Sequence, residues 1–124
     1  HRSPHQVIEL IKTSESNGCK LFIAAAGMAA HLAGAVAAHS HKPVIGIPIE
    51  SGGLGGLDAL LSTAQMPPGI PVATVAIGKA GAKNSAILAI QMLAISNEDM
   101  ANKFSTYRSN LTNEVLEKNK KLNA

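Results

Sequence analysis

The chain has 124 residues and a mass of 12.8 kDa, a size at which we expect a single domain with one hydrophobic core. Hydrophobic residues make up 46% and charged residues 15% of the chain, which excludes a disordered tail and argues against a membrane bundle. The net charge is only +3 and aromatic residues are 2%, so we expect no nucleic-acid partner, which would need a basic surface and stacking platforms.

The cysteine content and the hydropathy of the chain favour a reducing cytoplasm over a membrane. The single Cys19 has no partner for an internal disulfide or a zinc knuckle, so it fits a reducing cytoplasm and a packing role. Residues 21–38 are apolar apart from His31 and just reach the length of a membrane span. Their Ala and Gly content, His31 and the break at Gly27 favour a buried strand followed by a helix, so we expect no membrane partner.

The first third of the chain predicts the order helix, strand, helix. Ser3, Pro4 and Gln6 stand at the offsets of an N-cap, a first-turn proline and a capping-box acceptor. Asn17-Gly18 then ends the first helix, and Gly27 separates the strand from the second helix. The predicted elements are a helix over residues 4–15, a continuously buried strand over 20–25 and a helix over 29–39.

The rest of the chain continues the alternation. We predict a buried strand over residues 44–47, a glycine-rich loop, a helix over 57–63, a strand over 72–77, a turn over 78–81, a helix over 83–95 and a long polar helix over 97–122. The last helix carries one apolar stripe, formed by Met100, Phe104, Tyr107, Leu111 and Val115. This stripe belongs either to the core or to a contact with a neighbouring subunit.

Strands that alternate with helices pair in parallel through right-handed crossovers. The predicted fold is therefore α/β, a three-layer α/β/α sandwich with a parallel, flavodoxin-like sheet and a long C-terminal helix. In such sheets ligands bind beyond the carboxyl ends of the strands, where residues 24–28, 47–56 and 77–81 are rich in Gly, Ala or Ser. Small residues and helix N-termini there favour an anionic ligand such as a phosphorylated small molecule.

Glycine-rich segments alone identify no cofactor. Residues 52–56 do not form a dinucleotide fingerprint, and residues 78–81 are better explained as a strand-to-helix turn than as a phosphate loop. Of the histidines, His31 lies directly beyond a predicted strand in an Ala-rich helix, where packing does not call for an imidazole. A satisfied core histidine is the alternative, and we expect no metal site because no carboxylate or cysteine accompanies His31 at ligand spacing.

Four segments in order resemble a known family. They are His-Arg-Ser-Pro at residues 1–4, Ala-Gly-Met-Ala-Ala-His-Leu at 26–32, Leu-Asp-Ala-Leu-Leu-Ser at 57–62 continuing into Gln-Met-Pro-Pro-Gly-Ile-Pro-Val-Ala-Thr at 65–74, and Ala-Ile-Gly-Lys-Ala-Gly-Ala at 76–82. Together they resemble PurE, the N5-carboxyaminoimidazole ribonucleotide mutases of purine biosynthesis. The segment over 65–74 resembles the bacterial mutase type rather than the carboxylase type.

The resemblance implies an isomerase that moves a carboxylate from N5 to C4 of an aminoimidazole ribonucleotide without metal or organic cofactor. It implies His31 as general acid and base, with His1 also lining the site. The implied substrate-binding residues are Arg2, which grips the phosphate, the backbone of Ala26, Gly27, Met28 and Ala29 around the aminoimidazole, and Leu32. It further implies a cytoplasmic homo-octamer in which the C-terminal helix contacts a neighbour.

The sequence also departs from the family. The family usually has Gly where Met28 stands and Pro where Ala33 stands, so we expect a different loop shape before His31. The family's N-terminal strand and Gly-Ser-x-Ser-Asp loop are missing, so we expect residues 1–124 to be one PurE-like domain truncated at its N-terminus. The alternatives are a carboxylase that adds CO2 directly to aminoimidazole ribonucleotide, a non-catalytic binding or assembly module, and a generic flavodoxin-like nucleotide binder.

Overall fold

The computed structural model describes residues 2–122. The chain divides into two compact units, and the boundary falls between Ile87 and Leu88, inside a helix. Each unit is described by itself below. The expectation of a single domain stays a prediction.

The first unit alternates helices and strands. Its elements are α1 (Pro4–Ser16), β1 (Phe22–Gly27), α2 (Leu32–His39), β2 (Val44–Ile49), α3 (Leu57–Ala64), β3 (Ala73–Thr74) and the beginning of α4 (Gly78–Ala94). The three strands form one parallel sheet in the order β1-β2-β3. The predicted α/β class with a parallel, flavodoxin-like sheet is confirmed.

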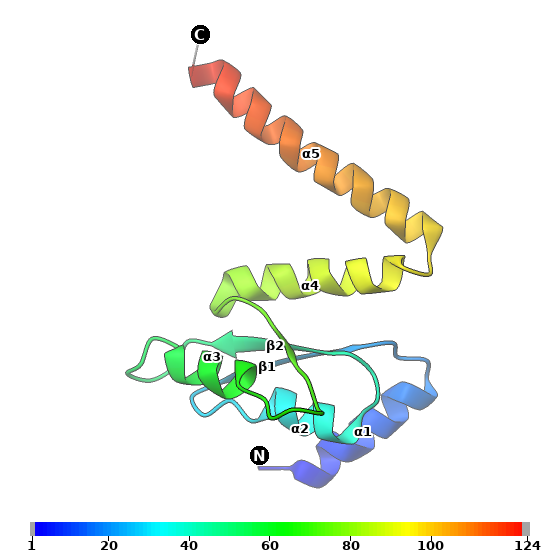
Figure 1. The fold of residues 1–124 in the computed structure, drawn as a ribbon, viewed down its shortest axis with the longest axis vertical. Helices are drawn as coiled ribbons and strands as arrows, with labels where there is room; N and C mark the ends of the chain where they lie inside the picture. Colours follow the sequence, from blue (N-terminus) through cyan, green and yellow to red (C-terminus); the bar gives the residue numbers. More distant parts are fainter. Residues whose placement is uncertain (1, 123–124) are drawn as a thin grey trace. The chain divides into compact units, whose positions relative to one another are not determined.

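One face of the sheet is covered by α1, α2 and α3, which lie together below it in Figure 1. The core cluster on this face joins α1, β1, α2 and β2 through Ile11, Ala24, Ala33, Val36 and Val44. On the other face of β2, Ile45 is fully buried, and the start of α4 (residues 78–87) runs along this side (Figure 1). Burial on both faces explains the continuous apolar sequence of β2.

Two predictions about the first helix and strand are wrong. Ser3 makes no side-chain capping hydrogen bond, because its backbone φ of −140° and ψ of 59° do not form the predicted capping box. The strand begins at Phe22 instead of residue 20, and it is not continuously buried, since Ile23 is 45% exposed. β1 is an edge strand of the described sheet, and only the face that carries Ala24 packs against α1 and α2.

Three further boundaries differ from the prediction. α2 begins at Leu32 instead of residue 29, because Met28 has a φ of +55° and its carbonyl accepts a hydrogen bond from the Ala30 N–H at 2.8 Å, which a helix cannot contain. β3 has two residues because it pairs only with β2 through Ala73 and Thr74. α4 includes the predicted turn, and Gly81 lets that first helical turn approach the preceding backbone.

The second unit contains the end of α4 and α5 (Glu98–Leu122). α5 begins as predicted, and the side chain of Asn97 caps it by accepting a hydrogen bond from the Met100 N–H at 3.0 Å. No residue of α5 is buried, although the rings of Phe104 and Tyr107 stack at 6.2 Å. The apolar stripe therefore forms no buried core, and its contact with a neighbouring subunit stays a prediction.

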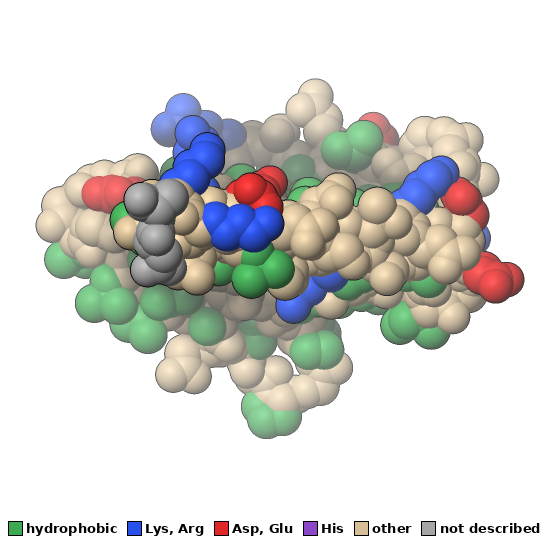
Figure 2. All heavy atoms as spheres, turned by 90° about the horizontal axis from the view of Figure 1, so that it is seen from above, with side chains coloured by type: hydrophobic (Ala, Val, Ile, Leu, Met, Phe, Trp, Pro, Cys, Tyr) green, Lys and Arg blue, Asp and Glu red, His purple; other side chains and the backbone are tan. Residues whose placement is uncertain are grey.

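Charge and hydropathy in the structure follow the composition. On the face shown in Figure 2, Lys and Arg side chains lie among Asp and Glu side chains and form no single basic patch. α5 carries two exposed ion pairs, Lys103 with Asp99 and Lys120 with Glu117. None of the helices within residues 2–122 is long and apolar enough to cross a membrane.

Candidate active site

His31 occupies the junction between β1 and α2. It is the N-cap residue of α2, with a φ of −98° and a ψ of −29°, and its carbonyl accepts the hydrogen bond from the Ala35 N–H at 3.0 Å. No side chain caps the N–H groups of the first turn of α2. The partial positive charge of the helix N-terminus therefore lies beside His31 and favours a negatively charged ligand there.

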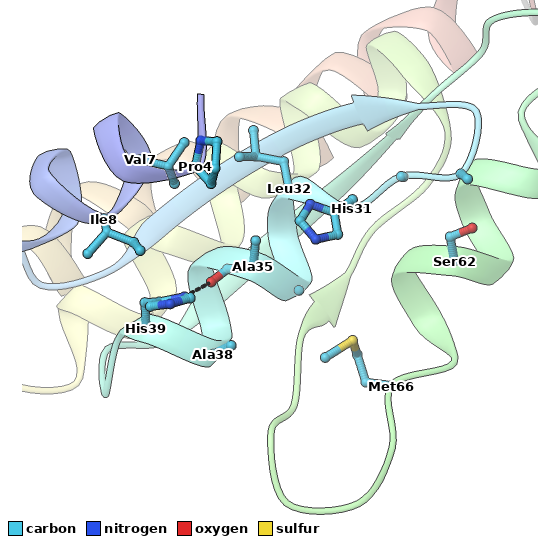
Figure 3. Close-up of a pocket in the computed structure, with 13 residues that line it drawn as sticks. Pro4, Val7, Ile8, His31, Leu32, Ala35, Ala38, His39, Ser62 and Met66 are labelled. Carbon is cyan, nitrogen blue, oxygen red and sulfur yellow. Dashed lines mark hydrogen bonds between the residues drawn. The ribbon is translucent and has the colours of Figure 1, made fainter. Parts of the chain in front are cut away.

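A cavity of about 470 Å³ opens beside His31. Figure 3 shows that α1 contributes one wall, α2 with its preceding loop the middle, and α3 with the segment after it the other side. The lining residues are Pro4, Val7, Ile8, Ala29, Ala30, His31, Leu32, Gly34, Ala35, Ala38, His39, Ser62 and Met66. Most of this surface is apolar, so a polar ligand group entering it meets only a few hydrogen-bonding side chains.

The three polar side chains of the cavity differ in whether they already make hydrogen bonds within the protein. The His39 Nδ1 donates a hydrogen bond to the Ala35 carbonyl at 2.8 Å, and the Ser62 hydroxyl donates to the Asp58 carbonyl at 2.7 Å. The His31 ring makes no hydrogen bond to any other residue within 2–122, and its side chain is exposed. His31 is therefore the imidazole that remains available to a ligand in this cavity.

Small residues shape the wall along α2. A Cβ atom on Gly34 would lie 3.4 Å from the Met66 Sδ, so α2 and the segment after α3 approach closely at this point. Ala35 and Ala38 continue the wall along the helix. The apolar, hydroxyl-poor surface suits a flat ring or a small uncharged molecule better than a sugar.

Only part of the sequence-predicted site meets at the cavity. Ala29 and Leu32 line it together with His31. Ala26, Gly27 and Met28 do not line it, because they form the end of β1 and the tight turn that follows. That end of β1 is nevertheless the sheet edge at which ligands of open α/β folds bind.

Two predicted residues lie at the beginning of the chain. Arg2 is exposed and stands just before α1, whose first residue Pro4 lines the cavity. His1 lies outside the described residues. The roles of both residues stay predictions.

Sequence reasoning did not find several lining residues. Val7 and Ile8 lie within the predicted first helix and were not expected at the site, but both line the cavity. Met66 and Ser62 belong to segments that carry the family resemblance, which is the only signal that could have pointed to them. No group of three His, Cys, Asp or Glu side chains suited to hold a metal ion occurs within residues 2–122.

A parallel α/β sheet, an apolar cavity and a free imidazole at a helix N-terminus define a ligand-binding α/β protein with the means for acid–base chemistry. Residues 1–114 match the AIR carboxylase family, and the chain belongs to this family. The resemblance found in the sequence is thereby confirmed.

Relatives with curated names are similar over almost the whole chain. The N5-carboxyaminoimidazole ribonucleotide mutase of Bacillus subtilis is 48% identical over 122 residues, which cover 98% of this chain and 75% of the relative. The enzyme of the same name from Escherichia coli K12 is 47% identical over 94% of this chain and 69% of its own length. The one from Saccharolobus solfataricus is 50% identical, again over 94% of this chain, and 72% of it is covered.

Proposed function

We propose that this protein is an N5-carboxyaminoimidazole ribonucleotide mutase, an isomerase of purine biosynthesis that forms 4-carboxy-5-aminoimidazole ribonucleotide. The observation that carries the proposal is the 48% identity to a mutase over 98% of the chain, a range that includes His31 and the segments around it. The substrate is an aminoimidazole ribonucleotide, in agreement with the anionic small molecule that the fold favours.

The proposed reaction moves one carboxyl group and two protons. His31 in its protonated form donates a proton to N5 as the N5–carboxylate bond breaks and CO2 is released into the cavity. C4 of the ring then attacks this CO2, and the neutral His31 removes the proton from C4. The imidazole returns to its starting form, so the sequence balances without an added oxidant, reductant or nucleotide.

The geometry supports this role for His31 in three ways. Its ring is exposed to the cavity and makes no hydrogen bond within residues 2–122, so both nitrogens are available for proton transfer. The uncapped N-terminus of α2 beside it favours the carboxylate form of the substrate. The apolar wall of the cavity, which includes Leu32 and Ala35, favours CO2 over water once the carboxylate has been lost.

The remaining residues of the site have binding roles in this proposal. Arg2 pairs with the phosphate, for which the planar guanidinium supplies two parallel hydrogen bonds. The backbone over Ala26, Gly27, Met28 and Ala29 holds the aminoimidazole, Leu32 packs against it, and His1 completes the site. A cytoplasmic homo-octamer is part of the same proposal, and the unburied apolar stripe of α5 supports a contact with another subunit.

The test is conversion of N5-carboxyaminoimidazole ribonucleotide to its C4 isomer, followed by ultraviolet absorbance in EDTA and without ATP. His31→Asn should lower turnover by about 10²–10⁴ and leave substrate binding nearly unchanged, because general acid–base catalysis contributes a factor of this size. His41→Asn is the matched control, since His41 is exposed and does not line the cavity. Turnover by His31→Asn close to that of the unaltered protein would refute the assignment.

Direct carboxylation of aminoimidazole ribonucleotide is the second candidate, because the matching family bears the description AIR carboxylase. The two reactions differ in the source of the carboxyl group. With ¹⁴C-bicarbonate in the medium, a mutase that retains its CO2 should form mostly unlabelled product from N5-carboxyaminoimidazole ribonucleotide. Efficient labelling of product from aminoimidazole ribonucleotide and bicarbonate alone would favour the carboxylase.

A further inference from the structure

Ser51 lies against the end of β1. β1 and β2 pair up to their last residues, where Gly27 is opposite Ile49, and Ser51 follows two residues later in the loop before α3. A Cβ atom built on Gly27 would overlap the Ser51 hydroxyl oxygen and would lie 3.2 Å from the Ser51 Cβ. The Ser51 side chain therefore covers the backbone of Gly27, and only glycine permits this approach.

The hydroxyl of Ser51 is free to bind a ligand. Ser51 is half-buried, yet its hydroxyl makes no hydrogen bond within residues 2–122. The hydroxyls of Ser16, Ser62 and Ser85 instead donate to helix carbonyls at 2.7 to 2.9 Å. No buried side-chain oxygen or nitrogen of the described chain lacks a partner, so the Ser51 oxygen is open to solvent.

The position of Ser51 indicates which group of the substrate it would contact. The proposed function places the aminoimidazole on the backbone that includes Gly27 and the phosphate on Arg2. If the aminoimidazole binds on Gly27 as proposed, the Ser51 hydroxyl, which covers Gly27, would lie beside the ring and its substituents. The carboxylate on N5 or C4 is the strong hydrogen-bond acceptor on that part of the ligand.

We propose that Ser51 is a further substrate-binding residue, whose hydroxyl donates a hydrogen bond to the carboxylate that migrates from N5 to C4. This inference rests on the proposed function. A hydroxyl rotates about its C–O bond and can follow an acceptor that changes position, which a backbone N–H cannot do. The contact distinguishes the carboxylated substrate and product from the decarboxylated ring.

The experiment compares two ligands by titration calorimetry on the full chain, 4-carboxy-5-aminoimidazole ribonucleotide and 5-aminoimidazole ribonucleotide. Ser51→Ala should weaken binding of the carboxylated ligand by about 10- to 100-fold, the range for a hydrogen bond to a charged group. It should leave binding of the ligand without the carboxylate unchanged. Ser51→Cys, which keeps the size but donates weakly, should show a smaller loss of the same kind.

Ser16→Ala is the matched control, because Ser16 is exposed at the end of α1 and its hydroxyl is already bonded to the Lys12 carbonyl. An equal loss for both ligands in Ser51→Ala would mean that Ser51 supports the loop, and unchanged binding of both would remove it from the site. Either result overturns the inference while the unaltered chain still binds and converts substrate. If the unaltered chain neither binds these ligands nor catalyses the isomerisation, the proposed function fails and this inference fails with it.

Discussion

The left-handed backbone at Met28 predicts that glycine is more stable than alanine at this position, the reverse of the usual order. Its φ of +55° costs a residue with a side chain about 1–2 kcal/mol, but glycine adopts it freely. Replacing Ala by Gly normally destabilises a protein by about 0.4–1 kcal/mol, because the unfolded chain gains freedom. The difference favours glycine here, so we expect Met28→Gly to be more stable than Met28→Ala by about 0.5–1 kcal/mol.

Comparing these two variants removes the contribution of the side chain. Met28 is 61% exposed, and both substitutions delete the same side-chain contacts beyond Cβ. For a slope of about 2 kcal/mol per molar urea, the unfolding midpoint of Met28→Gly should lie about 0.3–0.5 M above that of Met28→Ala.

The control for this comparison lies in regular helix. Ala38 is exposed within α2. Ala38→Gly should lower stability by about 0.5–1 kcal/mol, because glycine is normally less stable than alanine within a helix. A Met28→Ala variant as stable as Met28→Gly, with Ala38→Gly behaving normally, would show that the turn before His31 carries no strain.

Three other substitutions test separate parts of the structure. Arg2→Ala should weaken substrate binding at least about tenfold with little change in kcat, because a phosphate contact holds ground and transition states alike; a pure kcat defect in steady-state kinetics would contradict the phosphate role. Gly46→Ala should destabilise the protein by about 1–3 kcal/mol in urea unfolding, since its Cβ would overlap the Thr63 side chain, and a neutral result would mean that α3 moves without cost. Asn97→Ala should cost about 1 kcal/mol in the same assay by removing the cap of the Met100 N–H, and an unchanged midpoint would mean that the cap adds nothing to stability.

The sequence predicts the order of elements better than their ends. The start of β2 and the bounds of α3 were found almost to the residue, because burial on both faces and a glycine-rich start leave few alternatives. The predicted end of β2 at residue 47 is wrong, since the strand continues through Pro48 to Ile49. The start of α2 was missed, since a methionine gives no sign of a left-handed turn. At α4, Gly81 looked like a turn residue but serves a close contact with the Ala76 carbonyl inside the helix.

The candidate site was predicted in part. His31 could be identified from its place beyond a strand, because that position follows from chain order alone. The other wall of the cavity depends on how α1 and the segment at Met66 pack on α2, and such packing is not encoded in local periodicity. Ser51 was passed over for the same reason, since its contact with Gly27 joins the end of β1 to the loop after β2.

α1 is weakly anchored compared with the sheet. It contains a single buried residue, Ile11, yet it also supplies Pro4, Val7 and Ile8 to the cavity wall. Elements with few buried contacts open more often than the global fold does, so amide protons of α1 should exchange with solvent faster than those of β2. Each such opening removes one wall of the cavity, so under the proposed mechanism α1 exchange reports how often the compartment for CO2 would open.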